Sequence, residues 1–187
     1  TSDLHGDLDR LKTAAVKKLR RHDTLIVLGD FGFIWEDSKK EKKLLKKLGK
    51  RKFQILFLEG THDNYELLKQ YPQEFFCGGE ARLISGKLRQ LCRGGVFEIE
   101  GKKLFCFGGG VSRDREERAE LGTWWQGEMA TEAEKAAALA NLAKNDFKVD
   151  YICTHEGPAR LVQFLDMDLP EADDTELFLD EIAEKTE

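Results

Sequence analysis

Short apolar runs and amphipathic segments alternate along the chain. The runs are rich in β-branched and aromatic residues and stop at glycine or polar positions, which is typical of buried strands. They predict strands at 24–28, 53–58 and 149–153. The amphipathic segments carry apolar residues at helical spacing and predict helices at 8–21, 38–48, 131–144 and 175–185, with a short helix between residues 64 and 71.

Local signals mark the ends of several predicted helices. Ser38 stands three positions before Glu41, and Thr131 stands three positions before Glu134. This spacing is that of a capping box, in which each side chain bonds the backbone N–H of the other residue. Gly49 then supplies a C-terminal stop for the first of these helices.

The middle of the chain has a different pattern. Two apolar runs at 96–99 and 104–107 flank the polar segment 100–103, which predicts a β-hairpin. Three consecutive glycines follow at 108–110. Since there is no internal repeat, low-complexity linker or domain boundary, we expect one α/β domain over residues 1–187, with helices outside the sheet or sheets.

Composition and charge narrow the class of protein. The net charge is −5, and the basic run at 39–52 lacks interleaved aromatic residues, so it predicts the solvated face of a helix rather than a nucleic-acid or membrane patch. No apolar stretch reaches the roughly 20 residues that span a membrane, and the first residues do not resemble a signal peptide. The four cysteines form no CxxC pair, which disfavours a disulfide scaffold or a zinc ribbon. A cytoplasmic protein is therefore expected.

Candidate chemistry lies at the ends of the predicted strands. Four polar clusters occur there or at the start of the chain: Asp3-Leu4-His5-Gly6, Gly29-Asp30, Gly60-Thr61-His62-Asp63 and Thr154-His155-Glu156-Gly157-Pro158. The carboxyl ends of strands in an open α/β sheet meet at one edge, where ligands bind. Clusters that are distant in sequence are therefore expected to converge on one site.

The residue types at these positions suit divalent metal ions. Asp3 and His5 alternate, so on an extended strand end they would point the same way and grip one ion. Asp30 has two carboxylate oxygens and could bridge two ions, while His155 offers an imidazole nitrogen. Mixed imidazole and carboxylate sites suit manganese, iron or zinc better than calcium. Each residue taken alone is as well explained as a cap, a turn or a surface histidine, so the prediction rests on the whole set.

The order of these motifs resembles that of the calcineurin-like metallophosphoesterases. The order is Asp-x-His-Gly, Gly-Asp, Gly-x-His-Asp and a Thr-His after a strand. Residues 108–128, with Gly108-Gly109-Gly110, Ser112, Asp114, Arg118, Trp124-Trp125 and Glu128, also resemble a bacterial metallophosphatase branch of that family. The resemblance covers nearly the whole chain. It implies a two-sheet β-sandwich flanked by helices, with four α-β-β-α layers.

The resemblance also implies roles for individual residues. Two divalent ions would be held by Asp3, His5, Asp30, Thr61 and His155, with Asp30 bridging. His62 would lie beside the leaving-group oxygen as a proton donor or electrostatic stabiliser, and Asp63 would orient it. Arg113, Arg115 and Arg118 are candidates for phosphate contact, although a solvated helix start explains them equally well.

The sequence departs from the family pattern in two ways. Position 61 is normally asparagine in the family, whose amide oxygen binds the second metal, whereas Thr61 has one shorter hydroxyl group. The final Gly-His-x-His of the family is absent, and the strand expected before Asp3 is missing. We therefore expect the sequence to be a fragment or partial record of a longer protein.

Two kinds of function remain open at this point. The first is a dimetal hydrolase of phosphomonoesters or phosphodiesters, acting on a phosphorylated small molecule or a phosphoprotein; nucleic acid is disfavoured by the net acidity. The alternative is a catalytically silent member that binds metal or a phosphorylated ligand as a scaffold, as Thr61 and the missing histidines favour. The oligomeric state, the physiological metal and the substrate have no readable signal.

Overall fold

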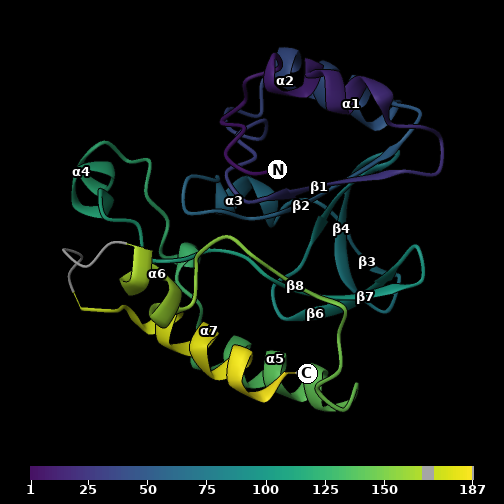
Figure 1. Cartoon of the computed structure of the whole chain (residues 1–187). Helices are drawn as coiled ribbons and strands as arrows, with labels where there is room; N and C mark the ends of the chain where they lie inside the picture. The colour runs from purple at the N-terminus through teal and green to yellow at the C-terminus, as the bar shows by residue number, and fades with distance from the viewer. Residues whose placement is uncertain (166–170, 187) are drawn as a thin grey trace.

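The strands of the computed structural model, which describes residues 1–165 and 171–186, form two sheets (Figure 1). The larger sheet has the order β1-β2-β5-β4-β3, in which β1, β2 and β5 are parallel and β4 and β3 are antiparallel additions. The smaller sheet has the order β6-β7-β8, with an antiparallel hairpin and a parallel third strand. The bounds are β1 (Thr24–Leu28), β2 (Gln54–Leu58), β3 (Gln73–Phe76), β4 (Gly79–Ser85), β5 (Leu88–Leu91), β6 (Gly95–Ile99), β7 (Lys102–Phe107) and β8 (Tyr151–Thr154).

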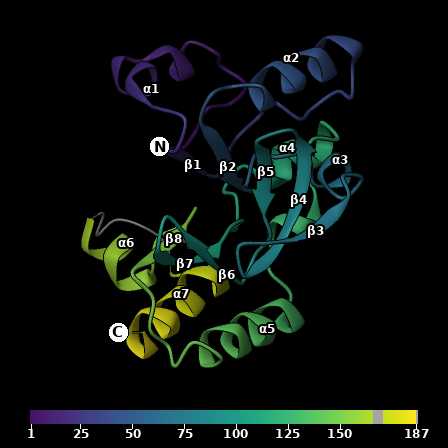
Figure 2. The ribbon, with the colours of Figure 1, turned by 90° about the vertical axis from the view of Figure 1, so that its right-hand side faces the viewer.

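Helices cover the outer faces of both sheets. Figures 1 and 2 show α1 and α2 on one side of the molecule and α5 and α7 on the other, with the sheets between them. The helix bounds are η1 (Arg10–Lys12), α1 (Ala14–Lys18), α2 (Lys39–Gly49), α3 (Tyr65–Leu68), α4 (Arg115–Glu120), η2 (Gln126–Glu128), α5 (Glu132–Ala143), α6 (Ala159–Leu165) and α7 (Asp174–Lys185). Within residues 1–165 and 171–186, no helix has the length and apolar character needed to cross a bilayer.

The alternation of side chains along β2 shows how the layers are held together. Ile55 and Phe57 pack into the apolar cluster beneath α1 and α2, whereas Leu56 and Leu58 pack into the cluster between the two sheets. Successive strand residues point to opposite faces, so a strand covered on both sides is apolar throughout. A third cluster, which includes Phe105, lies between the smaller sheet and the helices α5 and α7. The four-layer arrangement expected from the resemblance is confirmed.

Most of the predicted elements are present. The strands at 24–28, 53–58 and 149–153, the hairpin, and the helices at 38–48, 131–144 and 175–185 are found within two residues of the predicted bounds, and the short helix after residue 64 forms but ends at Leu68. The capping box at Thr131 is complete. At Ser38 only half of it forms, because the Glu41 carboxylate bonds the N–H groups of Trp35 and Glu36 instead.

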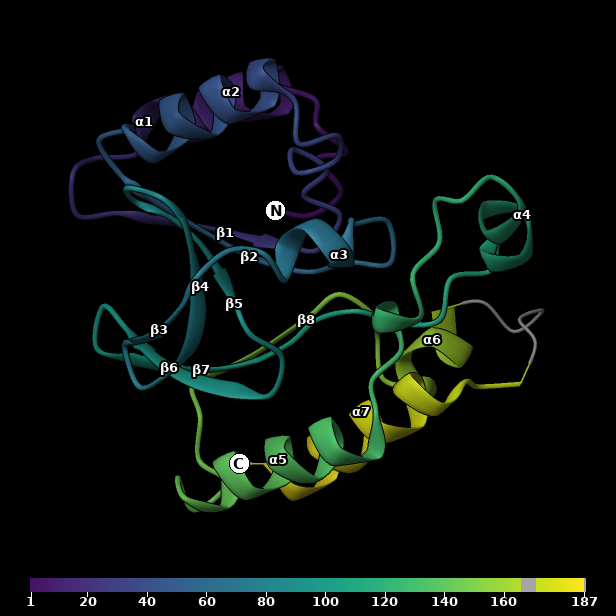
Figure 3. The same cartoon turned by 180° about the vertical axis from the view of Figure 1, so that it is seen from behind.

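Some elements differ from the prediction. The helix predicted over 8–21 divides into η1 and α1, because Thr13 adopts an extended backbone and its side chain caps α1. Strands β3, β4 and β5 and helices α4 and α6 had no predicted counterpart. Residues 111–128, which carry α4 and η2, leave the body of the sandwich and return to it; we call them the 111–128 segment (Figure 3).

Candidate metal centre

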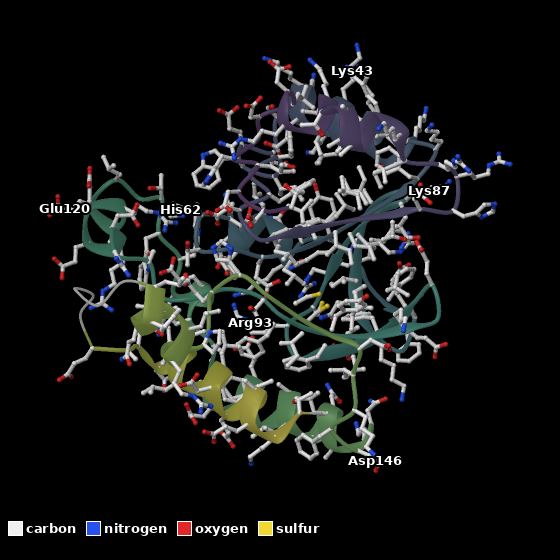
Figure 4. All side chains as sticks on the ribbon, viewed as in Figure 1. Lys43, His62, Lys87, Arg93, Glu120 and Asp146 are labelled. Atoms are coloured by element: carbon white, nitrogen blue, oxygen red, sulfur yellow. The ribbon has the colours of Figure 1, made fainter. Side chains whose placement is uncertain are left out.

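The polar clusters of the sequence meet where β1, β2 and β8 end. Residues 3–6 run beside residues 29–31, and three backbone hydrogen bonds of 2.9, 3.1 and 3.2 Å join the two segments. The loop after β2 brings His62 to the same place, and β8 leads directly into His155. Figure 4 shows His62 on the side of the molecule from which α4 extends.

Asp30 is the centre of this cluster. Its carboxylate is buried, and three imidazole rings surround it: Oδ2 lies 3.6 Å from His5 Nε2 and 3.1 Å from His62 Nδ1, and Oδ1 lies 3.5 Å from His155 Nε2. The backbone N–H of His62 also donates to Oδ1 at 2.8 Å. The structure therefore brings together residues that the sequence places far apart.

Asp3, His5 and Asp30 form a set of donors that fits a divalent ion. One ligand atom from each of the three residues lies within 4.8 Å of the other two. The two carboxylates and one imidazole are the donor types that manganese, iron and zinc accept. Asp3 and His5 point toward one site as predicted, but the extended backbone predicted for them is wrong. Both have left-handed backbone angles, with φ of 56° and 45°, and Asp30 has φ of 52°.

The left-handed backbone of Asp3, His5 and Asp30 is locally unfavourable, and the surrounding fold must hold these residues in that conformation. Non-glycine residues adopt this conformation infrequently, and it tends to occur at functional sites. Here it turns the side chains of Asp3 and His5 toward Asp30 without an extended strand. Residues outside the cluster, such as Asp146, also have positive φ, so these angles explain how the side chains are aimed and the donor set identifies the site.

Two close approaches place His155 against Asp30. The Nδ1 atom of His155 lies 2.9 Å from the carbonyl oxygen of Leu28, which fixes the ring and leaves Nε2 facing Asp30. An imidazole that binds a metal through one nitrogen is usually oriented by a hydrogen bond from its other nitrogen. Gly29 makes this possible, since a Cβ atom there would lie 2.1 Å from His155 Nδ1. A Cβ atom at Gly60 would likewise lie 2.1 Å from Asp30 Oδ1.

Thr61 is buried between two of the histidines. Its hydroxyl oxygen lies 3.0 Å from His62 Nδ1 and 3.5 Å from His155 Nε2. The hydroxyl therefore lies at the part of the cluster where a second ion would share Asp30 with His155. A neutral hydroxyl is the weakest donor in this group.

Asp63 does not orient His62, contrary to the prediction. Its buried carboxylate accepts hydrogen bonds from the N–H groups of Phe31, Gly32 and Gly60 at 3.3, 2.9 and 2.9 Å, and so joins the loops that follow β1 and β2. Burial raises the pKa of Asp63 to about 6, although the three N–H donors act in the opposite direction. Asp63 is thus a structural part of the site, and other carboxylates contact the His62 ring.

One of these carboxylates belongs to Asp114, which the metal motifs of the sequence do not include. Asp114 Oδ2 lies 3.1 Å from His62 Nε2. Burial alone would raise the pKa of Asp114, but the hydrogen bond to His62 and the charge of Arg118 hold it below its usual range. Asp114 is the residue before α4. Its distance from His62 depends on the path of the 111–128 segment, which no local pattern reveals.

The three arginines of the 111–128 segment have different surroundings. Arg113 and Arg115 are exposed and line a cavity of about 870 Å³ beside Thr61 and His62. Arg118 is buried and paired with Glu128, so neither the candidate phosphate contact nor the solvated helix start describes its surroundings here.

The partners of Arg118 form a buried polar cluster at the base of the 111–128 segment. Glu128 is completely buried, and its Oε1 accepts hydrogen bonds from the backbone N–H and the hydroxyl of Ser112 at 2.9 and 2.6 Å. Arg118 Nη1 lies 3.3 Å from Glu128 Oε2 and donates to the Ser112 hydroxyl at 3.1 Å. Arg118 also donates to the carbonyl oxygen of Thr123 at 2.9 Å. These bonds join the two ends of the 111–128 segment to α4.

Glu156 is another carboxylate beside the site. It follows His155, is partly buried and lines the same 870 Å³ cavity. Burial raises the pKa of its carboxyl, and Asp173 and Glu176 act in the same direction, while His155 opposes them. Gly110 makes room for this side chain, because a Cβ atom there would lie 2.3 Å from Glu156 Cγ.

Comparison with known proteins gives one finding. A family model described as calcineurin-like phosphoesterase matches residues 1–182. Searches of curated proteins and of solved structures give no match.

Proposed function

Because the chain belongs to the calcineurin-like phosphoesterase family, we propose that it hydrolyses phosphate esters with two divalent metal ions bound around Asp30. The observation that carries the proposal is the convergence of three histidines on this single buried carboxylate. Burying a carboxylate without a compensating charge is unfavourable. Ions at this position would supply that charge.

The donors divide into two sets around Asp30. Asp3 and His5 would hold the first ion together with Asp30, and their ligand atoms already lie within 4.8 Å of one another. His155 and Thr61 would hold the second, with Asp30 shared between the two. Manganese, iron and zinc fit these donors. Two bound ions supply positive charge to a phosphoryl group and activate water near neutral pH.

His62 would act on the leaving group. Its Nδ1 faces Asp30 and Thr61, while its Nε2 faces Asp114 beside the 870 Å³ cavity. An ester oxygen that entered from the cavity would therefore meet Nε2, which can hold or donate a proton there. Exposed Arg113 and Arg115 line the same cavity and would attract an anionic substrate. The substrate class in this proposal is a phosphorylated small molecule or a phosphoprotein.

Hydrolysis of p-nitrophenyl phosphate and bis(p-nitrophenyl) phosphate with added Mn²⁺ tests the proposal. We expect turnover that a chelator abolishes, and a loss of at least about 100-fold in kcat/KM for Asp30→Asn, because that change removes the charge shared by both donor sets. Asp146→Asn is the matched control, since Asp146 is exposed and has a similar left-handed φ of 54°. Equal activity of Asp30→Asn and the unchanged protein would contradict the proposal.

A second candidate function is a catalytically silent scaffold that binds a metal ion or a phosphorylated ligand. The observation that favours it is the Thr61 hydroxyl at the second donor set, where the family has an amide oxygen. In that case calorimetry would detect one Mn²⁺ ion per chain, and neither ester would be hydrolysed. Binding of two ions together with chelator-sensitive turnover would exclude the scaffold.

A further inference from the structure

The cavity beside His62 has an acidic lining. Six carboxylates line it, from Asp114, Glu116, Glu156, Glu171, Asp173 and Glu176. Among the described residues of this lining, two guanidinium groups, those of Arg113 and Arg115, oppose them. The side chains of this lining therefore carry a surplus of negative charge, which opposes the attraction that the proposed ions exert on each further negative charge of a ligand.

Asp114 is the cavity carboxylate that contacts the His62 ring. Its Oδ2 lies 3.1 Å from His62 Nε2, and the other ring nitrogen lies 3.1 Å from Asp30 Oδ2. One imidazole ring thus separates Asp114 from the proposed metal centre. A phosphoryl group held between the ions and His62 Nε2 would lie next to the Asp114 carboxylate.

Arg118 and the absence of a capping bond together keep the Asp114 carboxylate beside His62. Asp114 precedes α4 but its side chain makes no capping bond to that helix, so the carboxylate is free to contact His62. Arg118 lies 3.8 Å from Asp114 Oδ1 and is fixed by Glu128. The buried cluster at the base of the 111–128 segment therefore keeps a negative charge at the mouth of the site.

Building on the function proposed above, we propose that Asp114 makes this site selective for phosphodiesters over phosphomonoesters. A phosphodiester carries one negative charge at neutral pH, whereas a monoester, with a second pKa near 6, carries nearly two. Arg113 and Arg115 attract both kinds of ester. The second charge of the monoester is the feature that Asp114 and the other five carboxylates disfavour.

Two substrates with the same leaving group measure this selectivity. We would compare kcat/KM for bis(p-nitrophenyl) phosphate and p-nitrophenyl phosphate in the unchanged protein, in Asp114→Asn and in Glu120→Gln. Glu120 is the control because it is exposed at the far end of α4 (Figure 4). Asp114→Asn should shift the ratio about tenfold toward the monoester, mainly through KM, as expected for one unit charge a few Å away at a partly exposed position. A ratio that stays the same, or that moves equally in Glu120→Gln, overturns the proposal.

Binding without turnover gives an independent measurement. Calorimetry on the Mn²⁺-loaded protein would compare methyl phosphate, mostly a dianion at pH 8, with dimethyl phosphate, a monoanion. Asp114→Asn should tighten the binding of methyl phosphate about tenfold and change that of dimethyl phosphate much less. Equal effects on the two anions, or none, overturn the role of Asp114. If the binding differs as expected but neither ester is hydrolysed, the hydrolase function fails and the charge selectivity stands.

Discussion

Replacing Glu128 with glutamine removes one half of the buried ion pair at the base of the 111–128 segment. Glu128 is completely buried and Arg118 nearly so, and their charged atoms lie 3.3 Å apart. Breaking a buried pair by removing one charge generally costs about 3–5 kcal/mol, because the remaining charge is left uncompensated. Asp114 lies 3.8 Å from the same guanidinium and offsets part of that loss, so we expect the lower end, about 3 kcal/mol.

Hydrogen exchange of peptides from the 111–128 segment measures this cost as an opening free energy. A loss of about 3 kcal/mol should speed exchange there roughly 100-fold, with smaller changes in the two sheets. Glu120→Gln, on the exposed end of α4, should leave exchange unchanged. The double variant Glu128→Gln with Arg118→Gln should lose about 2 kcal/mol less opening free energy than the two single variants added together. The reason is that neither side chain is left as an unpaired buried charge. Additive costs, or a change below about fivefold in Glu128→Gln, would refute the assignment of this pair.

Three further predictions concern the site and the cysteines. Thr61→Asn should tighten binding of the second Mn²⁺ ion by about 10- to 100-fold in calorimetric titration and leave the first step unchanged, because an amide oxygen is a better donor than a hydroxyl. Gly29→Ala should abolish that second step, since its Cβ would lie 2.1 Å from His155 Nδ1 and its φ is +89°; a retained second step would show that His155 is not a ligand. Cys77 is exposed and should react with an aromatic disulfide reagent in the folded protein, whereas Cys92, whose pKa burial raises to about 12, should react only on unfolding. Comparable labelling rates for the two thiols would contradict the last prediction.

The sequence predicts elements whose stability comes from their own apolar content. Strand β2 is recognisable because it is apolar throughout, and α5 because its capping box and its spacing agree. Strand β5, which reads Leu-Arg-Gln-Leu, lacks such a pattern. Its buried Gln90 is stabilised by a hydrogen bond of 2.8 Å to Glu59, a residue on a neighbouring strand end. A polar strand of this kind depends on partners that local periodicity does not contain.

The same distinction separates the two halves of the site. The convergence of Asp30 and Thr61 follows from topology, because they follow the neighbouring parallel strands β1 and β2. His155 follows β8 of the other sheet, so its approach to Asp30 depends on how the two sheets pack. The contact between Asp114 and His62 depends on how the 111–128 segment folds back on itself, and the role of Asp63 depends on two loops that approach each other. These are tertiary features, and the family resemblance implied Asp63 as the partner of His62.

Ion binding at the cluster around Asp30 would also be linked to folding. Its donors come from residues 3–5, 30, 61–62 and 155, which lie far apart in sequence and are brought together by the packing of both sheets. An unfolded chain offers no comparable set, so an ion that binds here binds the native state alone and shifts the unfolding equilibrium by mass action. At a free ion concentration 100 times Kd, one such site adds about 2.7 kcal/mol to the free energy of unfolding. The supply of metal would then govern how long the folded protein survives in addition to whether it is active.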